Sequence, residues 1–138
     1  MLGPMDSRSP TTTQQAIGAA AEERVASVLR AAGWAVLARN VRVGRSELDI
    51  VALDPGPPAS IVVVEVRARG RRDYGLAEET LDYRKRAALR RGIGELLASG
   101  VLPDGSPLPR LPLRFDLVAV DRGPDGGEAV RHHRGAPL

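Results

Sequence analysis

Cysteine is absent from the 138 residues, and aromatic residues are scarce, at 3%. The missing cysteines exclude disulfides and thiolate metal sites, so any metal ion must be held by oxygen or imidazole ligands. No apolar run approaches the ~20 residues that a membrane-spanning helix needs. The N-terminal segment 1–10 is polar and lacks the apolar centre of a signal peptide. We therefore expect one cytoplasmic domain with an aliphatic core and no membrane partner.

Lysine is also almost absent. Of the 20 Lys and Arg residues, set against 17 Asp and Glu, 19 are arginine and the exception is Lys85. The net charge of +3 is by itself weak support for a nucleic-acid partner. The cations are concentrated, however, in two runs: Arg67, Arg69, Arg71 and Arg72, and then Arg84, Lys85, Arg86, Arg90 and Arg91. Such runs are either solvated faces with local acidic partners or surfaces that contact phosphates.

Hydrophobic periodicity predicts a helix over residues 13–32 and a second helix over 78–98, with Gly92 and Gly94 weakening its centre. Strands are expected over 34–40, 46–53, 61–67 and 112–121, with a short edge strand over 128–133. The apolar run 61–64 indicates a strand buried on both faces, hence a central one. This order predicts an α/β domain over 13–133 with a central mixed sheet flanked by helices, a flexible tail over 1–12 and a C-terminal tail over 134–138.

Two carboxylates, Asp49 and Glu65, lie mid-strand among apolar neighbours. A buried carboxylate must find a cation or become protonated. The Pro/Gly-rich segment 54–58 suggests that the two strands pair as a hairpin, which brings both acids onto one face, where Mg²⁺ or Mn²⁺ would relieve their repulsion. The alternative is that each acid pairs with a nearby arginine: Arg67 or Arg69 for Glu65, and Arg42 or Arg45 for Asp49.

Alternation along 46–53 places Glu47 on the face of Asp49, and Leu48, Ile50 and Ala52 on the other face. Glu47 is then either an additional ligand or, as we favour, the partner of an arginine. Among other candidates, Trp34 and Tyr74 are the groups considered for base stacking, although packing is favoured for both.

Two features near the C-terminus have structural explanations. Asp116 follows Arg114 by two residues, which favours an ion pair between them. His132 and His133 resemble a metal-binding pair only superficially, and we expect both to be exposed near the Gly/Pro-rich terminus.

Segments 46–52 (SELDIVA) and 63–69 (VVEVRAR) resemble the GE(I/L)D(L/V)IA and FVEVKxR motifs of the YraN family. That bacterial family is similar to archaeal Holliday-junction resolvases and other PD-(D/E)xK nucleases. The resemblance continues in order over about residues 15–133, with matches at 21–33, 38–40, Tyr74-Gly75, Lys85 and 114–116. It implies a restriction-endonuclease-like core and a metal-dependent endonuclease that acts on DNA, branched or otherwise structured DNA included, with a homodimer as an open possibility.

The resemblance also implies roles for single residues. Asp49 and Glu65 would hold Mg²⁺ or Mn²⁺, joined by the carbonyl of Val66, and Glu22 would reach them from the first helix. Helical phase favours Glu22 over Glu23, because Glu22 shares its face with inward-pointing apolar residues. The catalytic residues expected are Glu22, Asp49, Glu65 and Arg67. The nucleic-acid-binding residues expected are Arg67, Arg69, Arg71, Arg84 and Lys85.

The chain departs from the family pattern at Arg67, where the motif has lysine. Arginine is effectively never deprotonated, and its planar fork suits phosphate oxygens, so Arg67 is better adapted to phosphate binding than to proton transfer. The alternative function is therefore a catalytically inactive nucleic-acid-binding or protein-interaction module that retains the nuclease fold.

Overall fold

A computed structural model of the chain describes residues 10–69, 81–123 and 125–138. Within these ranges, two helices, α1 (Pro10–Ala31) and α2 (Tyr83–Ser99), accompany one five-stranded sheet. Its strands are β1 (Ala35–Val43), β2 (Ser46–Asp54), β3 (Ser60–Arg69), β4 (Leu113–Arg122) and β5 (Glu128–His133). They lie in the order β1-β2-β3-β4-β5, and only β3 and β4, which α2 connects, run parallel. The expected α/β domain with a mixed sheet is confirmed.

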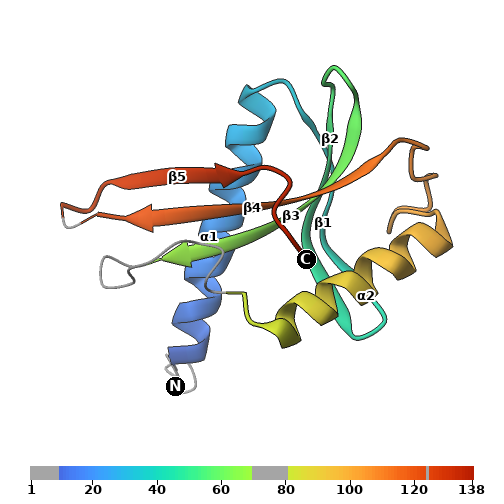
Figure 1. Cartoon of the computed structure of the whole chain (residues 1–138). Helices are drawn as coiled ribbons and strands as arrows, with labels where there is room; N and C mark the ends of the chain where they lie inside the picture. Colours follow the sequence, from blue (N-terminus) through green and yellow to red (C-terminus); the bar gives the residue numbers. More distant parts are fainter. Residues whose placement is uncertain (1–9, 70–80, 124) are drawn as a thin grey trace, which may run out of the picture.

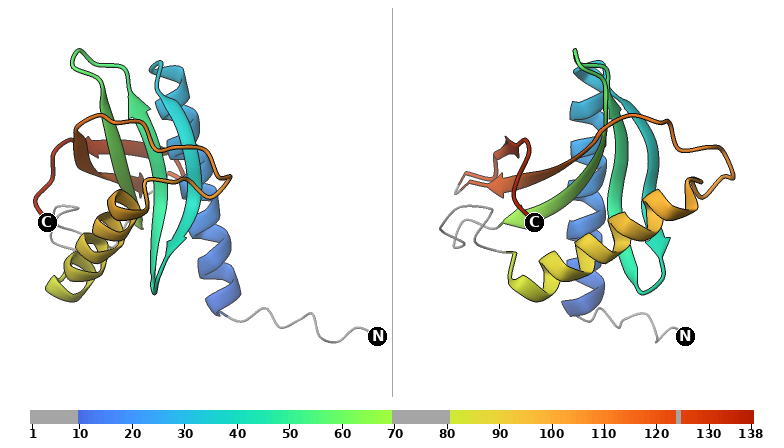
Figure 2. Two further views of the ribbon diagram at one scale, coloured as in Figure 1. Left: turned by 90° about the vertical axis from the view of Figure 1, so that its right-hand side faces the viewer. Right: turned by 45° about the vertical axis from the view of Figure 1, so that its right-hand side comes forward.

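The two helices cover opposite faces of the sheet (Figure 1), and the turned views in Figure 2 show the sheet between them. The core therefore has two halves. Val63 and Leu89 belong to the half beneath α2, whereas Val62, Val64 and Leu29 belong to the half beneath α1. Since successive residues of a strand point to opposite faces, β3 is buried on both sides, and its predicted central position is confirmed. None of the described helices is long and apolar enough to cross a membrane.

The helix ends differ from the sequence-based prediction. α1 begins at Pro10, so the predicted boundary at residue 13 was wrong, and residues 10–12 are helix rather than tail. α2 begins at Tyr83 rather than at residue 78. Asp82 has an extended backbone (φ −76°, ψ 175°), and its side chain accepts a hydrogen bond from the Lys85 N–H at 2.9 Å. This N-cap explains the later start, because it satisfies an amide that the first helical turn leaves without a partner.

Residues 134–138, expected as a tail, return to the sheet. The Gly135 N–H donates to the Asp116 carboxylate, and the Ala136 N–H donates to the Phe115 carbonyl, each at 2.9 Å. Leu138 packs against the core half beneath α2. The final residues are thus held along β4 by hydrogen bonds from two backbone amides, one to a side chain and one to a carbonyl, and by apolar contact.

Strand β2 changes face at Asp49. Leu48 packs in the core half beneath α2, whereas Ile50 packs in the half beneath α1, although residues two apart in a regular strand share a face. The predicted alternation was therefore wrong at this point. On β1, Asn40 lies between the partners of Leu48 and Ile50 and adopts φ 50°, a left-handed conformation that asparagine tolerates better than most residues.

Helix α2 lies close to β2 at Gly92, which is buried. A Cβ atom at Gly92 would lie 3.0 Å from Ser46 Cβ, and the Ser46 hydroxyl donates to the Ala88 carbonyl at 2.9 Å. A Cβ at Gly94, in contrast, would meet no described atom within 4 Å. Gly92 thus lowers helix propensity but permits the close packing of α2 on β2.

Candidate functional site

The pairing of β2 with β3 ends at Ile50 and Val64, although β2 begins at Ser46 and β3 continues to Arg69. The Asp49 carboxylate lies at this end of the pairing, where its Oδ2 accepts a hydrogen bond from the Val66 N–H at 2.8 Å. The side chain thus replaces a strand carbonyl as the partner of a backbone amide, which would otherwise be left unsatisfied. This contact fixes Asp49 beside β3.

Glu65 is the buried acid of β3, with only 2% of its surface exposed. Because Val64 and Val66 pack toward α1, Glu65 faces α2. Its Oε2 lies 3.4 Å from Lys85 Nζ at the start of α2 and 3.6 Å from Arg67 Nη1. Its Oε1 is buried and has no hydrogen-bond partner in the part of the chain that the structure describes.

Burial, followed by the charge of Asp49, raises the pKa of Glu65 to about 8, although Lys85 and Arg67 partly oppose the rise. Burial also raises the pKa of Asp49, against the lowering effect of the Val66 N–H. Two acids whose pKa values are both raised form a pair that lacks positive charge. The two nearby cations compensate for only part of the cost of holding both carboxylates ionised.

Glu22 is a third acid, which α1 contributes from the other face. Its pKa is raised to about 7, first by burial and then by the charge of Asp49. Glu23 differs, because its side chain is 59% exposed and accepts a hydrogen bond from Arg39 Nη1 at 2.6 Å. The prediction from helical phase that Glu22, rather than Glu23, faces inward toward the strand acids is therefore confirmed.

The donor set matches the chemistry of a hard divalent cation. Carboxylate oxygens are the ligands that Mg²⁺ prefers, and a Mg²⁺ ion usually keeps several waters while one or two carboxylates bind it. The unpartnered Oε1 of Glu65 and the excess of negative charge fit an ion held by Asp49 and Glu65. Within residues 10–69, 81–123 and 125–138, no group of three or more His, Cys, Asp or Glu side chains is placed to hold a metal. The residues present therefore fit a site of two carboxylates.

The expected nucleic-acid-binding residues fall into three groups. Arg84 is exposed on α2, whereas Lys85 and Arg67 turn toward Glu65. Arg71 and the side chain of Arg69 lie outside the described residues, as does Tyr74.

Several pairings weighed from the sequence can now be compared with the geometry. Glu65 does approach Arg67, but Asp49 bonds to the backbone of β3, and no described ion pair joins it to Arg42 or Arg45. Glu47 is exposed, and no ion pair of Glu47 is found among the described side chains, although its charge raises the pKa of Glu22 and Asp49.

The contact of Lys85 with Glu65 was not predicted from the sequence. The two residues are 20 positions apart and come from different elements, so no periodicity connects them. The one available signal was composition, because this residue is the single lysine among 20 cations.

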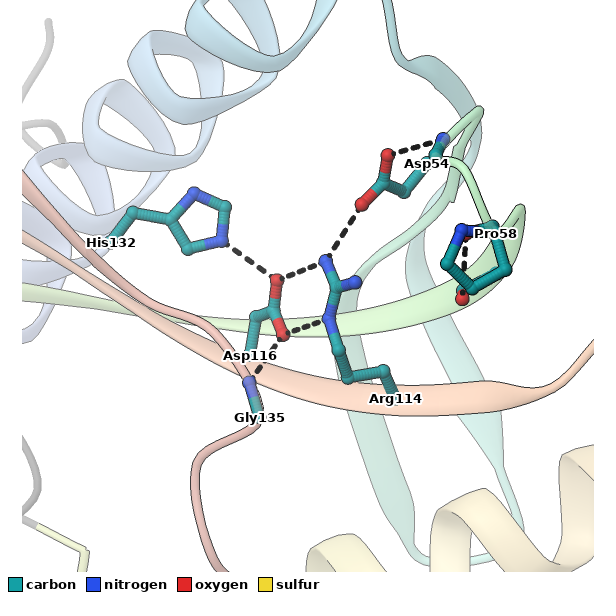
Figure 3. A network of polar contacts seen from close by, with 8 residues as sticks. Asp54, Pro58, Arg114, Asp116, His132 and Gly135 are labelled. Carbon is teal, nitrogen blue, oxygen red and sulfur yellow. Dashed lines mark hydrogen bonds and ion pairs between the residues drawn. The ribbon is translucent and has the colours of Figure 1, made fainter.

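A second polar network is centred on β4 and extends to Asp54 at the end of β2 and to His132 on β5 (Figure 3). Asp116, which is fully buried, accepts hydrogen bonds from Arg114 Nε at 2.8 Å and Nη2 at 3.0 Å, and contacts His132 Nε2 at 2.7 Å. Arg114 also donates to Asp54 at 3.0 Å. The predicted ion pair of Arg114 with Asp116 is confirmed. The expectation that His132 and His133 are exposed was wrong, because both are half-buried. The His132 ring packs edge-on against Trp34 with centroids 5.5 Å apart.

The chain matches the model of Uncharacterised protein family UPF0102 over residues 21–120. It belongs to the UPF0102 family. A UPF0102 protein of Sorangium cellulosum is 42% identical over 117 residues, which are 85% of this chain and 77% of that protein. UPF0102 proteins of Symbiobacterium thermophilum and Deinococcus radiodurans are 39% and 34% identical, over 80% and 86% of this chain and 86% and 93% of their own lengths. The UPF0102 match includes Glu22, Asp49, Glu65 and Lys85 and ends before β5.

Proposed function

We propose that this UPF0102 protein is a metal-dependent DNA endonuclease of the YraN type with a PD-(D/E)xK core. One observation carries the proposal: the buried Glu65 carboxylate interacts with the Asp49 carboxylate and lies 3.4 Å from the ammonium group of the only lysine in the chain. An acid pair beside a cation, at the point where two strands separate, is a costly arrangement for stability alone. The mixed sheet between two helices supports the same core.

Asp49 and Glu65 would hold Mg²⁺ or Mn²⁺, with the Val66 carbonyl as a further oxygen donor. When bound, such an ion supplies Lewis-acid stabilisation of a phosphodiester and lowers the pKa of a bound water. Glu22 would accept a hydrogen bond from water on the α1 side of the acid pair. Because its side chain reaches the same acids from the opposite helix, it restricts the space in which that water can lie.

Lys85 and Arg67 would together supply the positive charge that the single lysine of the family motif supplies. Both cations now oppose the charge of Glu65. A substrate phosphate placed at the acid pair would meet the planar guanidinium of Arg67 and the compact ammonium of Lys85, which suit oxygen pairs and single oxygens respectively. The exposed cations of α2, including Arg84 and Arg90, would contact neighbouring phosphates without regard to sequence.

Cleavage assays on the purified full chain test the proposal. Branched, single-stranded and duplex DNA are incubated with the protein in Mg²⁺, in Mn²⁺ and in a chelator. We expect metal-dependent cutting, and its loss in Asp49→Asn and Glu65→Gln, which keep the size of each side chain. Glu23→Gln is the matched control, because Glu23 is an exposed acid next to Glu22 and should be dispensable. Equal cutting by wild type and both amide variants would contradict the proposed centre.

A second function is favoured by Arg67 alone. A chain that retains the fold but lacks the motif lysine could bind DNA without cutting it. That function predicts DNA binding that survives chelation and weakens with salt, with no product in any metal. If DNA does not bind at low salt, both functions fail and a protein-interaction role remains.

A further inference from the structure

Tyr83 is an aromatic residue exposed on the surface. Solvent reaches most of this residue, with 77% of its surface exposed. The other aromatic residues in the described ranges, Trp34 and Phe115, are each only 6% exposed. A single exposed apolar side chain is common and needs no explanation on its own. The position of Tyr83 is what gives it significance.

Tyr83 is the first residue of α2 and precedes Lys85 by two positions. With a helix rise of ~1.5 Å per residue, the two residues begin ~3 Å apart along the helix axis. Lys85 Nζ is in turn 3.4 Å from Glu65 Oε2. Tyr83 therefore lies at the end of α2 that carries Lys85, although residues two apart do not share a helix face, so its ring points to another side of the helix.

The start of α2 holds Tyr83 in place. The Asp82 side chain caps the helix, and the Arg86 N–H donates to the Asp82 carbonyl at 3.0 Å, which closes the first turn around Tyr83. Residues seven apart share a helix face, so Tyr83 lies in line with the exposed Arg90. The ring thus adjoins cations on a fixed helix end and faces away from the core.

An aromatic ring beside a row of cations is the combination with which proteins bind single-stranded nucleic acid, because bases stack on the ring while cations follow the phosphates. In a duplex, each base is already stacked on its neighbours and offers no free face. We propose that Tyr83 stacks on an unpaired base at the end of α2 that carries Lys85, so that the substrate is DNA with unpaired bases, as at single strands, forks and branches. This inference rests on the proposed function.

Equilibrium binding in a chelator tests the stacking without cleavage. Fluorescence anisotropy would be measured with one labelled oligonucleotide, single-stranded or as its blunt duplex. Tyr83→Ala should weaken single-strand binding by about 5- to 150-fold, the effect of losing one stacked base. It should leave duplex binding and the salt dependence unchanged, because no charge is altered. Tyr83→Phe should bind as wild type does. Leu97→Ala, which changes a 51% exposed side chain at the other end of α2, is the matched control.

The outcomes separate the two proposals. If wild type binds DNA, and Tyr83→Ala binds the single strand and the duplex each as tightly as wild type does, the stacking role is overturned while the proposed function stands. A loss of the same size on single strand and duplex also overturns it. If wild type binds neither DNA at low salt, the proposed function fails and the stacking role fails with it. Loss on the single strand alone, with recovery in Tyr83→Phe, supports the stacking role.

Discussion

The Asp116 network provides a prediction about stability in acid. Burial alone would raise the pKa of Asp116, but hydrogen bonds from His132, Arg114 and the Gly135 N–H outweigh it and lower the pKa to about 2. Against the ordinary value of 3.8, the difference corresponds to about 2 kcal/mol in the free energy of unfolding. Because the folded-state pKa is the lower one, this stabilisation is complete above about pH 5 and is lost as the pH falls toward 2.

Asp116→Asn removes the charge and keeps the shape. We expect the variant to lose at least about 2 kcal/mol at pH 7, since Arg114 keeps only Asp54 as an ionised partner in this network. The difference from wild type should shrink as the pH falls from 5 to 2.5, because the wild-type carboxylate then becomes neutral as well. Urea unfolding followed by the fluorescence of Trp34 measures it, since the Arg114 guanidinium lies 5.5 Å from that ring.

Glu95→Gln is the control for this prediction. Glu95 is an exposed acid of α2 that lies outside the network, so its variant should follow the wild-type pH profile. A difference between wild type and Asp116→Asn that stays constant between pH 5 and pH 2.5 would refute the reasoning. It would mean that packing, rather than charge, makes Asp116 important.

Three further outcomes follow from the acid pair and from α2. In a chelator, Glu65→Gln should be more stable than wild type in urea, and increasingly so from about pH 4.5 to 8, because the raised pKa of Glu65 makes its ionisation in the fold costly over that range; an equal urea midpoint at pH 8 would count against this. Gly94→Ala should raise the free energy of unfolding by about 1 kcal/mol. Gly92→Ala should lower it by about 1 kcal/mol through the clash with β2. Equal increases in the free energy of unfolding for both variants would contradict the clash and show that α2 can shift away from β2. Lys85→Ala should reduce the rate of cleavage at saturating DNA. Arg84→Ala should instead weaken binding to all DNA sequences and reduce the slope of log affinity against log salt by about 1. Identical cleavage and binding behaviour of the two variants would contradict a role for Lys85 at the acid pair.

Much of the sheet could be predicted from the sequence, because local patterns dictate it. The apolar run ending at Val64 required a central strand, and the Pro/Gly segment 54–58 required a turn between two paired strands. The same locality placed Asp49 and Glu65 in one hairpin. Helical phase identified Glu22, because the apolar residues of α1 already fixed which side faces inward.

The predictions that were wrong concern features that depend on contacts between helices and strands. The acidic residues at 78–82 resemble a first helical turn, but only the conformation of Asp82 shows that the helix starts after it. The change of face at Asp49 accompanies the left-handed backbone of Asn40 on the neighbouring strand. The alternation of residues within β2 gives no information about the backbone of another strand, so it could not predict this change. His132 meets Asp116 because β5 pairs with β4 in one register, and residue spacing does not specify that register.

The composition around the acid pair has a practical consequence for chemistry in solution. Lys85 carries the only side-chain amine in the chain, and this amine touches Glu65. An amine-reactive label therefore marks one side chain at the site, and the rate of labelling reports whether DNA or Mn²⁺ covers it. Acetylation of Lys85 would remove one of the two cations beside Glu65 and leave Arg67 as the other. A single acyl group would thus alter the charge of the whole centre.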